Sequence, residues 1–226
     1  MQTLNFVQSV STVLLPLADP QRAEGMKAYM RGQFDFLGIQ TPLRRQATAA
    51  ILKPPCSPET LITHAADLWK QPQREFQYVA VDLLSKHARH LSLAQLDAIL
   101  ALAQRRSWWD TVDGLAMITG RLIRAARALD PSAQRHMDNA LHHPDLWIRR
   151  IAMLHQIGWR EETDTERLFT YAETLAKEQD FFIRKAIGWA LRDHARHAPS
   201  AVRDFLARST HILSALSIRE AGKHLQ

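Results

Sequence analysis

The sequence predicts an all-α fold, built as a solenoid in which pairs of helices repeat along the chain. Three observations support this prediction. Apolar residues recur every three or four positions through successive segments of roughly 12 to 18 residues, which is the period of an amphipathic helix. Only eight of the 226 residues are glycine, which is few for a protein made of strands and tight turns. A short sequence pattern also returns at a constant interval.

Helix starts are marked by a capping side chain followed by proline, which fits the first helical position because it needs no backbone N–H there. Ser92 and Asp180 are predicted N-caps without the proline. About a dozen helices are expected, and no segment has the alternation of a strand. The four cap–proline pairs are Asp19-Pro20, Thr41-Pro42, Ser57-Pro58 and Asp130-Pro131.

The internal repeat is clearest in the second half of the chain. Ile148-Arg149-Arg150 is followed 35 residues later by Ile183-Arg184-Lys185, and 35 residues later again by Ile218-Arg219-Glu220. Earlier steps of the same length reach Asp113, Tyr78 and Leu43. A period of ~35 with two helices per unit predicts about six HEAT-like repeats. No linker interrupts them, so residues 1–226 are predicted to form a single domain.

The net charge and the cysteine content indicate which class of partner and which cellular compartment to expect. The formal net charge is +6 and the pI is about 9.8, which favours a polyanionic partner such as nucleic acid or an anionic membrane surface. Cys56 is the single cysteine, so no intramolecular disulfide can form, and a reducing, cytoplasmic location is expected. No segment reaches the ~18 apolar residues of a membrane span, and no basic residue precedes the apolar run 10–17 as in a secretory signal.

The repeat predicts where the basic residues gather, because residues at one phase of successive repeats lie side by side. Seven cations at two adjacent phases are therefore expected to form a basic band on the concave face of the solenoid. Such a band suits a phosphate backbone. A solvated face of unrelated charges is the alternative. Arg45, Arg150 and Lys185 share the first phase, and Arg44, Arg149, Arg184 and Arg219 share the second.

The stretch 107–114 reads Ser-Trp-Trp-Asp-Thr-Val-Asp-Gly and is the strongest candidate for a reactive site. On a helix, Trp109 and Asp113 share one face, as do Lys185 and Trp189. A carboxylate beside a flat aromatic ring suits a cationic, sugar-like transition state. The alternative is a packed tryptophan beside a helix-capping aspartate.

Six motifs together resemble the AlkD-like family of DNA alkylation repair glycosylases. They follow the order of that family and cover nearly the whole chain. The motifs occupy residues 36–45, 68–77, 107–113, 146–152, 181–192 and 216–221.

The resemblance implies an enzyme that wraps duplex DNA and excises alkylated purines, chiefly 3-methyladenine and 7-methylguanine. It places the catalytic carboxylate at Asp113 and the two tryptophans beside the lesion at Trp109 and Trp189. No catalytic role is carried over to Asp110. The residues that the resemblance assigns to the DNA are Tyr29, Thr41, Arg45 and Arg150, and the basic band adds Arg149, Arg184 and Lys185.

Excision of such a base needs little machinery, because N3- or N7-alkylation leaves the purine positively charged and ready to depart as a neutral molecule. One carboxylate can stabilise the remaining oxocarbenium ion and orient water. No metal or cofactor is expected, and the two His-Ala-Arg-His sequences at 87–90 and 194–197 are ascribed to helix ends. A monomer is expected. A solenoid that binds DNA without chemistry and a protein–protein scaffold are the alternatives.

Overall fold

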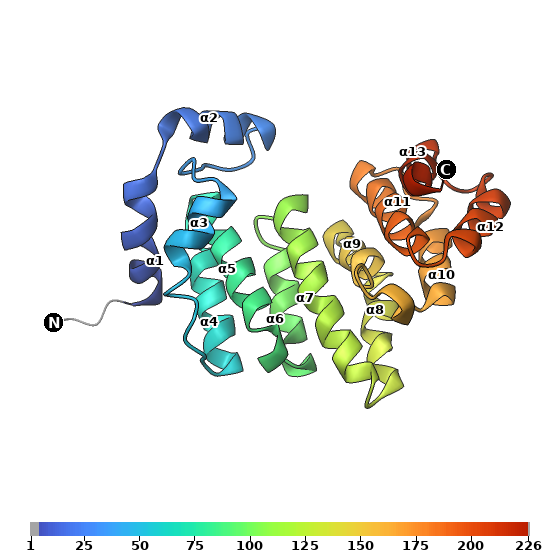
Figure 1. The fold of residues 1–226 in the computed structure, drawn as a ribbon, viewed down its shortest axis with the longest axis horizontal. Helices are drawn as coiled ribbons and strands as arrows, with labels where there is room; N and C mark the ends of the chain where they lie inside the picture. Colours follow the sequence, from blue (N-terminus) through green and yellow to red (C-terminus); the bar gives the residue numbers. More distant parts are fainter. Residues whose placement is uncertain (1–4, 226) are drawn as a thin grey trace. The chain divides into compact units, whose positions relative to one another are not determined.

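A computed structural model of the chain describes residues 5–225 (Figure 1). Within this range the chain forms thirteen α-helices and six short 3-10 helices. No strand is present in the described part, where the only strand-like pairing given is an isolated bridge between Asp35 and Gln73. The prediction of an all-α fold is confirmed.

The helices fall into two compact units, one ending at Leu102 and the other beginning at Ala103. The sequence predicted a single domain over residues 1–226, and that remains a prediction. In the first unit and at its end the α-helices are α1 (Phe6–Leu14), α2 (Pro20–Tyr29), α3 (Thr41–Thr48), α4 (Pro58–Trp69), α5 (Arg74–Lys86) and α6 (Leu96–Ala103). In the second they are α7 (Trp109–Arg127), α8 (Arg135–Ala140), α9 (Leu146–Leu154), α10 (Thr165–Leu175), α11 (Phe181–Ala195), α12 (Pro199–Ser209) and α13 (Ala215–Ala221).

The repeat found in the sequence corresponds to every second helix of the fold. Helices α3, α5, α7, α9, α11 and α13 begin at positions 41, 74, 109, 146, 181 and 215, so each starts 33 to 37 residues after the one before. All six repeat positions lie inside these helices. In the second unit α7 packs on α9, α9 on α11, and α11 on α13 (Figure 1). This packing of consecutive repeats is the arrangement that the ~35-residue period predicted.

Five of the six predicted caps are N-caps in the structure, with Ser92 and Asp130 preceding 3-10 helices. Asp19, Ser57 and Asp180 are the N-caps of α2, α4 and α11, and the side chain of each accepts a backbone N–H of the first turn. The prediction that Thr41 is an N-cap is wrong. Gln40 is the N-cap of α3 and forms no side-chain hydrogen bond there, and Thr41 is the first helical residue. Pro42 at the second helical position fits equally well, because that N–H also has no partner within the helix.

Close helix packing in the second unit depends on a glycine. A Cβ added at Gly188 of α11 would lie 2.5 Å from the Cβ of Glu220 and 2.9 Å from the carbonyl oxygen of Ser217, both on α13. Only a residue without a side chain permits this approach. The Ser217 hydroxyl also donates to the main-chain oxygen of Arg184 at 2.9 Å. The last two repeats are thereby held together at main-chain distance.

The loop between α2 and α3 is held in the first unit by one carboxylate. Glu75 is fully buried on α5, and its oxygens accept the backbone N–H groups of Leu37, Gly38 and Ile39 at 2.9, 2.9 and 3.1 Å. Gly38 has φ +86°, and a Cβ there would meet the main-chain oxygen of Asp19 at 2.1 Å. The loop conformation therefore requires both the glycine and the buried acid.

None of the helices in the described part of the chain is long and apolar enough to cross a membrane.

Candidate functional site

The candidate site is built on α7, which begins where the predicted tryptophan–aspartate stretch begins. Trp108 is the N-cap, with extended backbone, and its carbonyl accepts the N–H of Val112 at 3.1 Å. Trp109 is the first helical residue, and Asp113 follows one turn later. The two therefore share a helix face, as the sequence predicted.

Asp113 forms a two-point ion pair with Arg150 of α9. The carboxylate oxygen Oδ1 lies 2.7 Å from Nε of Arg150, and Oδ2 lies 2.9 Å from Nη2. The side chains of Asp113 and Arg150 are only 14% and 4% exposed. This is the side-on geometry in which a guanidinium and a carboxylate bind most strongly, here with little solvent to screen it.

The surroundings of Asp113 have opposing effects on the pKa of its carboxyl. Burial raises the pKa of its carboxyl above the ordinary aspartate value, and the hydrogen bond and charge of Arg150 act in the opposite direction. The charge of Asp110, one turn away on α7, adds to the rise. Burial outweighs Arg150, so the pKa of Asp113 is raised, and Arg150 is the group that opposes this rise.

Arg150 also reaches a third helix. Its Nη1 donates to the main-chain oxygen of Phe182, in the first turn of α11. Asp180 fixes that turn, because its Oδ1 accepts the N–H groups of Phe182 and Ile183 at 2.7 and 3.2 Å. A continuous polar chain thus runs from Asp113 on α7 through Arg150 on α9 to Phe182 on α11, in the order in which these helices pack (Figure 1).

The tryptophans differ in how far their side chains are buried. Trp147 and Trp159 are 9% and 4% exposed and belong to the core, whereas Trp109 and Trp189 are half-buried and retain accessible ring surface. Trp189 lies on α11 seven residues after Phe182, which is two turns along the same face. Both predicted lesion-flanking tryptophans therefore lie on helices that take part in the polar chain, and neither is a fully buried core residue.

The basic residues of the predicted band differ greatly in their surroundings. Arg44 and Arg150 are each only 4% exposed, so these two members of the predicted band are buried, and the contacts of the band with DNA remain a prediction. Their guanidinium groups instead face acids of the next or preceding repeat helix, Asp82 for Arg44 and Asp113 for Arg150. Arg219, on α13, is exposed as expected.

Three further cations of the band have partners within the protein. The guanidinium of Arg149 binds both oxygens of Glu178, at 2.6 and 2.8 Å, and the carbonyls of His143 and Pro144. Arg184 donates to the carbonyl of Glu178 and to Gln179. Lys185 lies 3.1 Å from a carboxylate oxygen of Glu220.

The remaining predicted DNA contacts lie in the first unit. Tyr29, at the end of α2, is 72% exposed. Thr41 is exposed at the start of α3, where its hydroxyl lies 3.4 Å from Nη1 of Arg44. Arg45 is 65% exposed in its side chain, although its guanidinium lies 3.0 Å from Asp82. These three side chains present polar groups on the surface of this unit.

Sequence reasoning missed the acids that hold the cations. Glu220 is 6% exposed and lies within 3.1 Å of Lys185, Arg192 and Lys223. The hydrogen bonds and charges of Lys223 and Lys185 lower its pKa to about 2. A signal was available, because Glu220 stands where the two preceding repeats carry Arg150 and Lys185. Phe182 was missed because its functional atom is a main-chain oxygen, which no residue type encodes.

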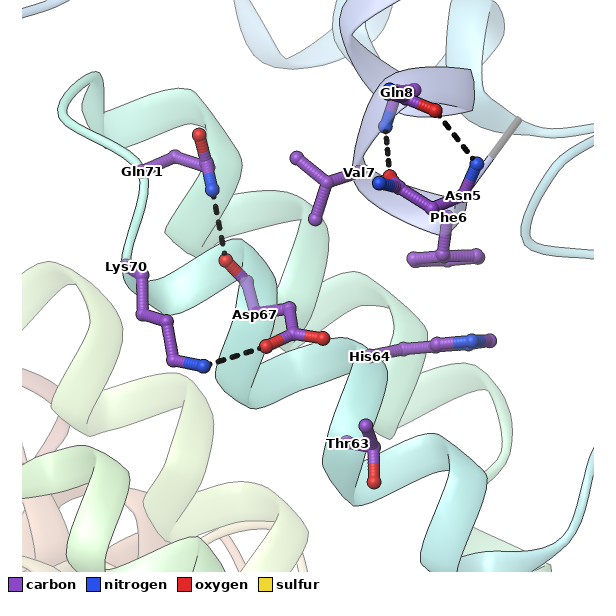
Figure 2. Close-up of a pocket in the computed structure, with 9 residues that line it drawn as sticks. All are labelled: Asn5, Phe6, Val7, Gln8, Thr63, His64, Asp67, Lys70 and Gln71. Carbon is purple, nitrogen blue, oxygen red and sulfur yellow. Dashed lines mark hydrogen bonds and ion pairs between the residues drawn. The ribbon is translucent and has the colours of Figure 1, made fainter.

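A separate pocket of about 430 Å³ lies between the start of α1 and the end of α4 (Figure 2). The ring of Phe6 stacks on His64 at 3.9 Å, and Lys70 pairs with Asp67 at 2.7 Å. The pocket shares no residue with the predicted site. No cluster of three or more potential metal ligands occurs among the residues that the structure describes.

The fold and the polar chain together define an all-α repeat protein with a largely buried carboxylate–guanidinium pair on helices that also carry half-buried tryptophans. The model of the DNA alkylation repair enzyme family matches residues 10–225, and the chain belongs to that family. A solved structure from Enterococcus faecalis, described as a predicted DNA alkylation repair enzyme, is similar, with a TM-score of 0.82 and 30% sequence identity. The match covers 92% of this chain and 96% of that one. No curated protein matches the sequence.

Proposed function

We propose that the protein is a monofunctional DNA glycosylase that hydrolyses the N-glycosidic bond of cationic alkylated purines, such as 3-methyladenine and 7-methylguanine, in duplex DNA. The observation that carries the proposal is the pair formed by Asp113 and Arg150. It holds a carboxylate that is only 14% exposed in a fixed direction, on the same helix as the half-buried Trp109. Membership of a DNA alkylation repair family supplies the substrate class.

The chemistry asked of Asp113 is electrostatic. An alkylated purine leaves as a neutral base, so positive charge develops on the deoxyribose as the bond breaks. A carboxylate in a poorly solvated place stabilises that charge more strongly than one in water, and it can orient the water that attacks. Tryptophan faces add a favourable interaction with a nearby cation, about 1–2 kcal/mol where water is excluded. Trp109 and Trp189 are proposed to act in this way.

Arg150 has two proposed roles. In the free protein it neutralises and orients Asp113. When DNA binds, a backbone phosphate near the lesion competes for the same guanidinium, because arginine binds phosphate and carboxylate in the same side-on manner. The carboxylate is then released from part of its ion pair and can stabilise the charge that develops on the sugar. The formal net charge of +6 and the exposed Arg45 favour approach of the DNA.

The proposal excludes strand cleavage through a covalent amine intermediate. Lys185 is the basic amine nearest in repeat phase to Arg150, and its Nζ is held in an ion pair 3.1 Å from a carboxylate oxygen of Glu220. The expected product is therefore an abasic site in an intact strand. A methylated duplex should release free 7-methylguanine and break only on later treatment with alkali. Strand breaks formed by the protein alone would contradict the monofunctional assignment.

One observation favours a second function. Because Arg150 neutralises Asp113 in the free protein, the same site could recognise damaged DNA without chemistry. In that case the methylated duplex would bind and no base would be released. The same assay therefore separates the two functions.

A further inference from the structure

Three aromatic rings meet at the N-terminal ends of the helices that carry the polar chain. The ring centroid of Phe182 lies 5.0 Å from that of Trp108 and 5.0 Å from that of Trp147, and the two tryptophan rings are 5.9 Å apart. Trp108 precedes α7, Trp147 is in the first turn of α9, and Phe182 is in the first turn of α11. We call these three residues the aromatic trio.

The trio and the polar chain use the same three helices. Helix α7 supplies Trp108 to the trio and Asp113 to the polar chain. Helix α9 supplies Trp147 and Arg150. Helix α11 supplies both from one residue, because the ring of Phe182 belongs to the trio while its main-chain oxygen accepts Nη1 of Arg150. A shift of any one ring therefore moves the backbone that sets the distance between Asp113 and Arg150.

We propose that the aromatic trio, with Phe182 at its centre, positions Arg150 and through it the carboxylate of Asp113. Phe182 is a positioning residue and touches neither the sugar nor the base. Trp108, the extended N-cap of α7, packs with the trio, whereas Trp109 is the first helical residue and is half-buried. The catalytic consequence rests on the proposed glycosylase function.

Edge-to-face and tilted ring contacts suit this task. They fix ring orientation as well as distance, and each contributes about 0.5–1.5 kcal/mol beyond the burial of its area. The Phe182–Trp108 contact is edge-on, with an interplanar angle of 66°. Loss of the Phe182 ring leaves Arg150 its two bonds to Asp113 and leaves the Asp180 cap, but it removes the ring contacts that hold the first turn of α11 against α7 and α9. The main-chain oxygen that accepts Nη1 of Arg150 is then less firmly placed.

The test compares Phe182→Ala with a matched substitution outside the trio. Phe169 of α10 stacks on Phe205 at 4.2 Å and has further ring contacts with His194 and Arg208, none of which belongs to the trio or to the polar chain. Phe169→Ala therefore removes the same side chain from the same unit. We expect Phe182→Ala to lower kcat for 7-methylguanine release about 10- to 100-fold, as small displacements of catalytic groups do, with KM changed less than about threefold. Phe169→Ala should leave kcat within about twofold of wild type.

Two further measurements separate positioning from general damage. The carboxyl pKa of Asp113, followed by NMR in the free protein, should rise in Phe182→Ala toward its value in Arg150→Ala and stay unchanged in Phe169→Ala. The double variant Phe182→Ala/Arg150→Ala should be no slower than Arg150→Ala, because the ring acts through the arginine. Phe182→Tyr, which keeps the ring, should restore kcat and pKa. If Phe182→Ala is poorly folded, Phe182→Leu and Trp147→Phe carry the same comparison.

The outcomes distinguish the two proposals. If wild type releases no base, the glycosylase function fails, and the Asp113 pKa still tests the positioning role. If wild type is active and Phe182→Ala keeps both its kcat and its Asp113 pKa, the positioning role is wrong.

Discussion

Gly120 and His155 bring α7 and α9 together at main-chain distance. A Cβ added at Gly120 would lie 1.9 Å from the carbonyl oxygen of His155. Gly120 is seven residues after Asp113, which is two helical turns along the same face of α7. The contact at Gly120 and the ion pair at Asp113 are therefore two points of one helix–helix interface, and the first sets the spacing that the second needs.

Gly120→Ala should destabilise the protein and weaken the site together. Overpacking against a main-chain oxygen outweighs the gain in helix propensity, so we expect the free energy of unfolding to fall by about 1–2 kcal/mol. Base release should fall as well, because α9 carries Arg150. Gly25→Ala in α2 is the control, since a Cβ there meets nothing within 4 Å. It should raise stability by about 0.5–1 kcal/mol. Equal thermal shifts in the two variants would refute the packing argument.

The pH dependence of base release should report the ionisation of Asp113. Burial raises the pKa of this carboxyl, and the active form is the anion, so kcat/KM should fall with decreasing pH at a value above that of an ordinary aspartate. Arg150→Ala removes the charge that opposes the rise. The acid limb should then move to higher pH, besides a large loss of rate.

Arg219→Ala is the matched control for that shift, because Arg219 is exposed on α13. If it contacts a phosphate, its loss should reduce the salt dependence of DNA binding by about one unit of slope. The acid limb of kcat/KM should not move. A limb that moves equally in both variants would mean that net charge, and not the Asp113–Arg150 pair, controls the titration.

His155 should make folding weaker in mild acid. It is 1% exposed, its Nδ1 and Nε2 lie 2.6 Å from the Ala152 oxygen and the Gln134 amide nitrogen, and burial lowers its pKa to about 4. The folded state therefore resists protonation that the unfolded chain accepts near pH 6.5. Stability from this residue is complete above pH 6.5 and declines as the pH falls toward 4, by about 2–3 kcal/mol in total.

The check is denaturant unfolding of His155→Gln between pH 7 and 4. The variant should be less stable at pH 7 and should lose less stability across this window than wild type. His136→Gln, at an exposed position of α8, should follow the wild-type curve. A His155→Gln curve parallel to wild type would show that other groups account for the acid sensitivity.

Glu75→Gln should loosen the loop between α2 and α3. A glutamine keeps the shape of the side chain but offers one oxygen where the carboxylate offers two, and its amide N–H groups face backbone donors. We expect a loss of about 2–3 kcal/mol, the size of hydrogen bonds to a buried charge. Glu59→Gln, at an exposed position of α4, is the control and should change little. Hydrogen exchange at Leu37, Gly38 and Ile39 would locate the effect, and unchanged protection there would contradict it.

The helices were predictable because their signals are local. Asp19 and Ser57 with the prolines after them, the period of ~35 and the scarcity of glycine all act through neighbouring residues. The start of α3 was predicted one residue late, because proline fits either the first or the second helical position. Pro42 therefore does not decide whether Gln40 or Thr41 is the N-cap. Such local signals predict where elements begin and say little about what their side chains meet.

The pairing of charges was not predictable in the same way. Arg44 and Arg150 follow the repeat as expected, but the repeat does not specify whether an arginine faces solvent or an acid on the neighbouring helix. Asp82 and Asp113 supply those acids from different phases of the repeat. Asp113 was a candidate because it lies one turn after Trp109, and its role remains a prediction. Its partner Arg150 became evident only from the packing of α7 on α9.

The central claim is that the Asp113 carboxylate drives the release of a cationic base. The most direct measurement is release of free 7-methylguanine from a methylated duplex by wild type and Asp113→Asn side by side, with duplex affinity measured for both. Asparagine keeps an oxygen for Arg150 and removes the charge. Wild type should release the base, and Asp113→Asn should bind the duplex within a few-fold and release essentially none. Release by Asp113→Asn at the wild-type rate would contradict the account.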